Sequence, residues 1–156
     1  MIRSIVKLGL VIMAFLALSA FTGQPSEERQ AQEELPQSHD RMWQILGKTR
    51  IGFDEKKEIY TAGIPDAVKA LAGKQVTVSG FILPLEPTET FKHFILSRNT
   101  PTCAFCLPGE PNEIIDVWLE KPIGWDEGMV KVTGTFELTS DQEMGMFFRI
   151  KEGKRQ

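Results

Sequence analysis

Two segments share the pattern Val-x-Val-x-Gly, and this alternation constrains the fold more than any other feature. It runs from Val76 to Gly80 in KQVTVSGFILPL and from Val130 to Gly134 in GMVKVTGTFEL. Because successive side chains of a β-strand point to opposite faces, the valines and the glycine share one face. A glycine there suits a small barrel, which must bend or bring two backbones close together. Side chains predicted to be buried are Val76, Val78, Val130, Val132 and Phe136; those predicted to face water are Lys131, Thr133 and Glu137.

Further short strands are predicted at FKHFILS (91–97), EIIDVWL (113–119) and MGMFFRI (144–150), and around Thr49 to Phe53. The segment IPDAVKALAG predicts a helix of two or three turns that starts at Pro65 and stops at Gly73. Closure into a barrel removes exposed strand edges. The predicted fold class is therefore mainly β: a small five- to six-stranded antiparallel barrel resembling the oligonucleotide/oligosaccharide-binding fold, with one short helix.

The N-terminus has the features of a secretory signal peptide. Residues 1–23 place Arg3 and Lys7 ahead of an apolar run, Leu8 to Ala20, that ends in small residues. An uncleaved anchor is the alternative, although the run is shorter than the roughly 20 residues that span a bilayer. We expect a periplasmic protein whose membrane contact, if the signal is uncleaved, is through this segment alone.

Residues 24–41 are expected to form a disordered tether, which leaves residues 42–156 as the barrel domain. The tether is rich in Gln and Glu, and its apolar content is too small to offset the entropy lost on ordering. Removal of the signal segment changes the formal net charge from −3 to −5, because the segment carries two basic residues and no acid. This balance argues against a nucleic-acid partner, which requires clustered Lys and Arg.

Both cysteines lie in one motif, TCAFCLPGEP, directly after the predicted strand that carries His93. Cys103 and Cys106 have the C-x-x-C spacing that supplies two thiolates to a tetrahedral zinc site, and His93 would add an imidazole. A structural zinc site needs four ligands. The candidates for the fourth are Glu110, Glu113, Asp116 or a water molecule.

Two other states of the cysteine pair stay open. A local 103–106 disulfide would clip the loop and contribute about 2 kcal/mol by the loop-entropy model. A redox-active pair gains its reactivity at a helix N-terminus, where the dipole lowers the thiol pKa. Pro108 and Pro111 disfavour a helix at that position, although a protonated His93 would partly replace the dipole.

The succession VTVSGFILPL, HFILS, TCAFCLPGEPNEIIDVW and VKVTGTFEL resembles the bacterial exported family catalogued as domain of unknown function 3299. The resemblance covers about Trp43 to Ile150. It implies an exported small barrel resembling the oligonucleotide-binding fold, often encoded beside transporter-like genes and linked to zinc, and it implies no particular activity. The matching positions are Gly80, Pro84, His93, Cys103, Cys106, Pro111 and Asn112.

Together these features predict a non-catalytic, exported metal-binding module, with zinc as the metal, that serves envelope metal handling beside a transporter or another protein. One alternative is a periplasmic thiol–disulfide protein that uses Cys103 and Cys106. Another is a scaffold barrel that binds a protein partner while the two cysteines form a structural disulfide. The sequence has no Gly-rich phosphate loop and no Ser nucleophile elbow, so it indicates no class of enzyme.

Overall fold

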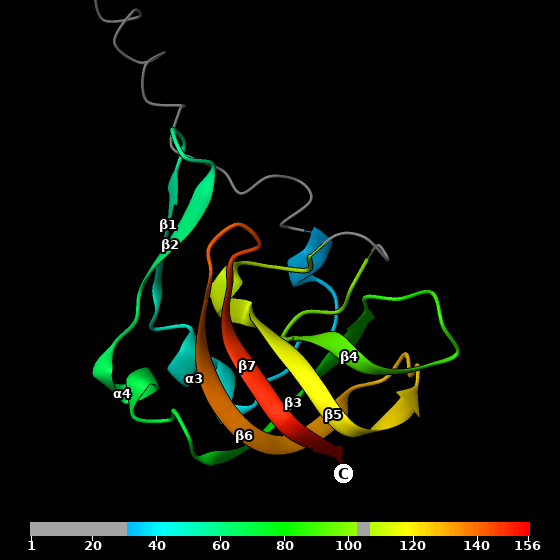
Figure 1. Ribbon diagram of the computed structural model, residues 1–156. Coiled ribbons are helices and arrows are strands. Elements are labelled where there is room, and N and C mark those ends of the chain that lie inside the picture. The colour runs from blue at the N-terminus through cyan, green and yellow to red at the C-terminus, as the bar shows by residue number, and fades with distance from the viewer. Residues whose placement is uncertain (1–30, 103–106) are drawn as a thin grey trace, which may run out of the picture. The chain divides into compact units, whose positions relative to one another are not determined.

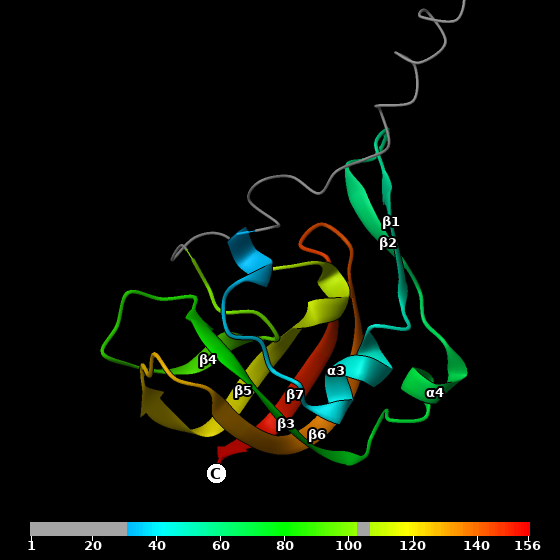
Figure 2. The same cartoon turned by 180° about the vertical axis from the view of Figure 1, so that it is seen from behind.

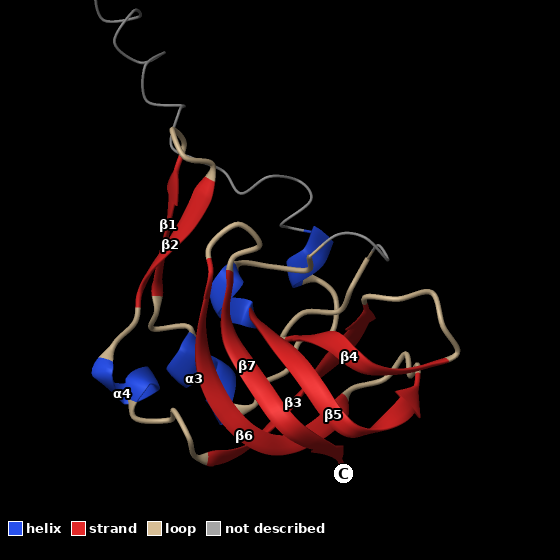
Figure 3. Ribbon diagram, in the orientation of Figure 1, coloured by secondary structure: helices blue, strands red, loops and turns tan. Residues whose placement is uncertain are grey.

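The computed structural model describes residues 31–102 and 107–156; the predicted signal segment 1–23 lies outside them. The described residues belong to one compact unit, Ala31–Gln156, which contains a five-stranded barrel, a separate hairpin and short helices (Figures 1 and 3). The elements are α3 (Arg41–Leu46), β1 (Arg50–Asp54), β2 (Ile59–Gly63), α4 (Asp66–Lys69), β3 (Gln75–Pro84), β4 (Thr90–Ser97), the 3-10 helix η1 (Pro111–Glu113), β5 (Ile114–Gly124), β6 (Val130–Asp141) and β7 (Met146–Arg155). Among the described residues, no helix has the length and apolar character needed to cross a membrane.

The five long strands form a closed barrel in the order β3-β4-β5-β7-β6. This is the strand order of the oligonucleotide/oligosaccharide-binding fold, so the predicted barrel is confirmed. Four of the five strand pairs are antiparallel, and the fifth, between β5 and β7, is parallel. A ring with an odd number of strands cannot alternate in direction at every junction, and one parallel pair is therefore required.

The alternation that predicted the barrel strands is confirmed by the burial of their side chains. Val78, Val132 and Phe136 are fully buried, and Val76 and Val130 are nearly so. On the opposite face of β6, Lys131 is exposed and its neighbours are partly exposed. The barrel interior is therefore the hydrophobic core, and α3 adds the side chains of Met42, Trp43 and Leu46 to it.

Both pattern glycines occupy close backbone approaches, as predicted. A Cβ atom on Gly80 would lie 2.5 Å from the Ser97 carbonyl oxygen, and one on Gly134 would lie 2.6 Å from that of Lys151. Real Cβ contacts are not this short. Each glycine therefore allows its strand to pack against a neighbour at a distance that any larger residue would prevent.

Ser38 and Asp40, which lie within the segment 24–41 predicted to be a disordered tether, are held against the barrel. Ser38 is 1% exposed, and its hydroxyl donates to the Ser79 carbonyl oxygen at 2.6 Å. One carboxylate oxygen of Asp40 accepts from the Met42 amide at the start of α3, and the other accepts from the Ser79 amide at 2.9 Å. Trp43 Nε1 also donates to the Ser79 carbonyl oxygen, at 2.8 Å.

Ser38 and Asp40 bond to Ser79 because part of β3 has no strand partner on one side. The first half of β3, Gln75–Gly80, pairs with β6, and only its second half, Phe81–Pro84, pairs with β4. The backbone groups of Ser79 that face β4 therefore lack a strand partner, and the segment before α3 supplies one (Figure 2). A buried backbone group left unpaired is costly. Polar composition alone does not reveal such an anchoring role.

The region between α3 and the barrel contains a hairpin and one turn of helix. Strand β1 occupies the short strand predicted around Thr49 to Phe53, and β2 pairs with it in an antiparallel arrangement that the sequence did not predict. The predicted two- or three-turn helix is shorter, because α4 covers only Asp66–Lys69, although Pro65 precedes it as expected. Gly73 has a φ of 77°, which ends the helical direction.

Candidate functional site

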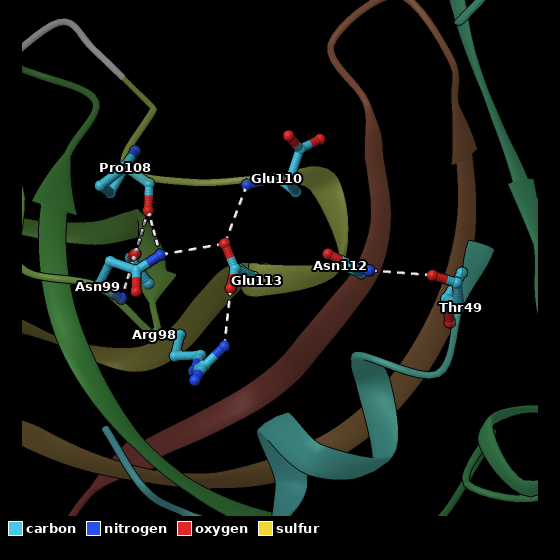
Figure 4. Close-up of polar contacts among 8 residues, drawn as sticks. Thr49, Arg98, Asn99, Pro108, Glu110, Asn112 and Glu113 are labelled. Carbon is cyan, nitrogen blue, oxygen red and sulfur yellow. Dashed lines mark hydrogen bonds and ion pairs between the residues drawn. The ribbon is translucent and has the colours of Figure 1, made fainter. Parts of the chain in front are cut away.

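The cysteine motif begins and ends on a stem of side-chain hydrogen bonds. Cys103 and Cys106 lie outside the described residues, but both flanks of the motif are described. Asn99 Nδ2 donates to the Pro108 carbonyl oxygen at 2.8 Å and to Glu113 Oε2 at 3.1 Å. The Ser97 hydroxyl donates to the same Pro108 carbonyl at 3.3 Å. These contacts join the two flanks directly (Figure 4).

Glu113 is the central acceptor of the stem. Besides Asn99, its carboxylate accepts from Arg98 Nη1 at 2.8 Å and from the Glu110 amide at 3.2 Å. Glu110 and Glu113 form a capping box around η1. Both are predicted above as possible fourth zinc ligands, and in the structure they lie at the base of the cysteine motif (Figure 4).

Further hydrogen bonds tie the stem to the rest of the fold. Asn112 Nδ2 donates to the Thr49 carbonyl oxygen at 2.9 Å, directly before β1 (Figure 4). The Thr100 hydroxyl donates to the Pro36 carbonyl oxygen at 2.6 Å. Pro111 is buried and lies against the turn between β6 and β7 at Gly145. Contacts with Thr49, Pro36 and Gly145 thus hold the two flanks of the cysteine motif in place.

A second cluster lies on the outer face of the barrel and includes His93. Its Nε2 atom lies 2.6 Å from Asp116 Oδ1. Arg149 Nε donates to Asp116 Oδ2 at 2.6 Å, and Trp118 Nε1 donates to the same oxygen at 3.2 Å. The rings of His93 and Trp118 stack with centroids 3.9 Å apart. We call these four residues the His93 cluster.

Asp116 is 2% exposed, so the cluster is organised around a buried carboxylate. Burial of a charge is costly unless the charge is paired and hydrogen-bonded, and here one cation and two ring nitrogens meet that need. A carboxylate only accepts hydrogen bonds, so His93 Nε2 carries a proton. His93 Nδ1 has no hydrogen-bond partner among residues 31–102 and 107–156.

Protein metal sites commonly use this arrangement. A ligating histidine donates one ring N–H to a carboxylate, which orients the ring and leaves the other nitrogen for the metal. Asp116 had been predicted as a possible fourth ligand. In the structure it instead contacts His93 itself, with both oxygens in use. Within the described part of the chain, no group of three His, Cys, Asp or Glu side chains is placed to hold a metal ion.

The His93 cluster and the stem lie on the same face of the same strands. Ser97 pairs with Ile114, and His93, four residues before Ser97 on β4, pairs with Trp118. Directly paired residues of an antiparallel sheet point to one side. Between the two sites Ile95 is fully buried and packs with Leu83, Ile114 and Met146. The outer surface of β4 and β5 therefore connects the stem to the His93 cluster.

The sequence predicted two members of this cluster, His93 and Asp116, and missed the other two. Trp118 follows Asp116 by two residues, and this spacing on a strand places both side chains on one face. That signal was available in the sequence. Arg149 is 33 positions from Asp116 and meets it only because β7 pairs with β5.

Comparison with known protein families shows the family of this chain. The profile of a family described as "Protein of unknown function (DUF3299)" matches residues 24–148. The chain belongs to this family. The resemblance inferred from the barrel strands and the C-x-x-C motif is thereby confirmed.

A crystal structure of a DUF3299 family protein from Pseudomonas aeruginosa PAO1 is similar to this chain, with a TM-score of 0.51 and 27% sequence identity. The match covers 62% of this chain and 66% of the other, so it spans slightly less than two thirds of that protein. No curated protein matches the chain. The comparisons therefore identify a family and a similar structure.

Proposed function

We propose that this protein is an exported, non-catalytic metal-binding module that takes zinc through Cys103, Cys106 and His93. The observation that carries the proposal is the hydrogen bond between His93 Nε2 and Asp116 Oδ1, with a distance of 2.6 Å. It orients the imidazole and leaves Nδ1 as the metal-binding atom. Asp116 then acts as the residue that positions His93, and a water molecule takes the fourth position.

Chain length allows the three ligands to meet. His93 and Ser97 are four residues apart on β4, which corresponds to about 13 Å along a strand. The four residues from Asn99, which the stem holds, to Cys103 can span about 13 Å when extended, and the two residues from Pro108 back to Cys106 about 7 Å. The stem fixes where this length of chain starts and ends, since Asn99 and Ser97 bond the Pro108 carbonyl. Pre-organised ends reduce the entropy that zinc binding must overcome.

The redox alternative is less well supported by the described residues. Residues 107–110, directly after the motif, are not helical, and η1 begins only at Pro111. The described residues that follow Cys106 therefore offer no helix dipole to lower its thiol pKa. The alternative of a structural 103–106 disulfide is compatible with the stem, because the hydrogen bonds of the stem join residues outside the cysteine pair.

Export and a role beside an envelope transporter or another protein complete the proposal. The family match begins at residue 24, directly after the segment with signal-peptide features. A small module with a zinc site that retains a water ligand suits transient binding, because the open position allows a partner's ligand to enter. Such a module would hold zinc for transfer rather than as a permanent structural ion.

The test measures zinc content, free thiols and mass on the exported protein purified without chelator. We expect one bound zinc and two thiols that react only after the zinc is removed. Cys103→Ser and Cys106→Ser should abolish tight binding, and His93→Ala should weaken it while the barrel stays folded. The matched control is His39→Ala, because His39 is the other histidine of the chain and is exposed.

Zinc affinity should rise with pH, because both thiols and the imidazole must lose protons to bind. A zinc-free protein with a mass 2 Da below that of the reduced chain would instead show a 103–106 disulfide. That result would contradict the metal proposal and favour the disulfide scaffold.

A further inference from the structure

A depression at the base of the β1–β2 hairpin is surrounded by basic side chains. It has a volume of about 660 Å³. Its lining includes three basic residues, Lys48, Arg50 and Lys69, and the segment Ala62, Gly63, Ile64 and Pro65. No carboxylate lines it. The sequence as a whole is acidic, with 21 Asp and Glu against 18 Lys and Arg, so composition does not explain this concentration of positive charge.

The charges of the depression are largely uncompensated. Neither Lys48 nor Arg50 has an ion pair among the described residues. Lys69 Nζ lies 3.4 Å from Asp66 Oδ1, but the Asp66 side chain is fully exposed. Exposed pairs of this kind contribute little. Lys48 and Arg50 are therefore free to act on an anion, and Lys69 is held only by an exposed ion pair.

Gly63 keeps the depression open beside Arg50. The two residues are directly paired across β1 and β2. A Cβ atom on Gly63 would lie 3.6 Å from both Cβ and Nε of Arg50, which is an ordinary contact distance. A methyl group would therefore fit at position 63. A longer side chain would extend along Arg50 into the space that the guanidinium borders.

We propose that this basic depression binds a phosphate group, carried by a small molecule or by a lipid headgroup. An arginine offers a planar fork of donors that matches phosphate oxygens, and lysines add point charges. The apolar lining residues Ala62, Ile64 and Pro65 would contact the non-phosphate part of the ligand. The volume is within the range of small-molecule sites. The site is separate from the stem and the His93 cluster.

Two probes distinguish the sources. Calorimetric titration of the full chain with inorganic phosphate at low ionic strength tests the free ligand. Co-sedimentation with phosphatidylglycerol vesicles, compared with phosphatidylcholine vesicles, tests the headgroup. We expect saturable binding in at least one arm, weakened about five- to tenfold by Arg50→Ala or by Lys48→Ala and weakened further by added salt.

Position 63 supplies a matched pair of variants. Gly63→Ala should bind as the unchanged protein does, whereas Gly63→Glu should abolish binding because it brings a carboxylate beside Arg50. Circular dichroism establishes that each variant is folded. Cys103→Ser should leave phosphate binding unchanged, which separates this site from the proposed zinc site. Absence of saturable binding in both arms, or binding that Arg50→Ala leaves intact, would overturn the proposal.

Discussion

Asp116 illustrates how one buried side chain organises a surface. It accepts hydrogen bonds from His93, Trp118 and Arg149, which come from three different strands. Its removal would leave Arg149 without a counter-charge and the imidazole without an orienting partner. Breaking a buried pair on one side is more disruptive than losing a surface pair. The residue therefore contributes to both the stability of the barrel and the orientation of His93.

For the proposed zinc site, Asp116→Asn should lower zinc affinity about 10- to 100-fold, the range found when an orienting carboxylate is lost. It should also reduce the free energy of unfolding by about 3 kcal/mol, because a half-buried guanidinium loses its partner. Zinc titration and urea denaturation measure the two effects. Asp66→Asn is the control, since that side chain is fully exposed and should change neither. Zinc affinity unaffected by Asp116→Asn would refute the positioning role.

Thr49 presents the opposite case, a buried polar atom that lacks a partner. Its Oγ1 is buried and has no hydrogen-bond partner in the described structure, although its backbone carbonyl accepts from Asn112. An unsatisfied buried hydroxyl is destabilising. Thr49→Val should therefore leave the free energy of unfolding unchanged or raise it by up to about 1 kcal/mol. Thr77→Val is the control and should lower the free energy of unfolding, because it loses a hydroxyl contact with Thr133. A larger decrease for Thr49→Val than for Thr77→Val would show that the Thr49 hydroxyl does have a partner.

At the scale of elements, strand packing depends on the two pattern glycines. Gly80→Ala would place a methyl group 2.5 Å from the Ser97 carbonyl oxygen, where β4 and β3 cannot separate without loss of their pairing. We expect a loss of roughly 2–3 kcal/mol in the free energy of unfolding. Gly124→Ala is the control, because its nearest contact would be 3.7 Å. Equal effects of the two substitutions would show that β3 tolerates the methyl group.

The stem behaves as an element of its own, although it contains only one turn of helix. Glu113→Gln would remove the charge that pairs with Arg98 and would exchange one acceptor oxygen for a donor. The free energy of unfolding should fall by about 1–3 kcal/mol. Amide exchange at Asn99 and Glu110 should rise. Glu143→Gln, in the exposed β6–β7 turn, should change neither.

At the scale of the whole molecule, the boundary of the domain can be tested by truncation. A chain that starts at residue 31 should be as stable as a longer one, whereas a chain that starts at residue 42 loses Ser38 and Asp40. Loss of their bonds to Ser79 and of the helix cap should reduce the free energy of unfolding by about 2–4 kcal/mol. Denaturant titration of both chains measures this. Equal stability would mean that the predicted tether boundary at Arg41 holds after all.

Features that depend on local patterns follow from the amino-acid sequence. Alternating valines and glycines specified β3 and β6, and the same period located β4, β5 and β7. These predictions succeeded because side-chain direction in a strand follows from backbone geometry alone. The family resemblance depended on the same runs of residues.

Tertiary structure alone decided the contacts that join distant segments. The Asp116–Arg149 pair requires β7 to lie beside β5, and that parallel neighbour follows from closing a ring of five strands. The anchoring of Ser38 and Asp40 requires the unpaired edge of β3 at Ser79, which exists only once β4 and β6 have taken their registers. Hydrogen bonds and ion pairs of this kind form between atoms that are close in space. Residues far apart in the sequence come close only when the barrel closes, so their separation in the sequence does not predict these contacts.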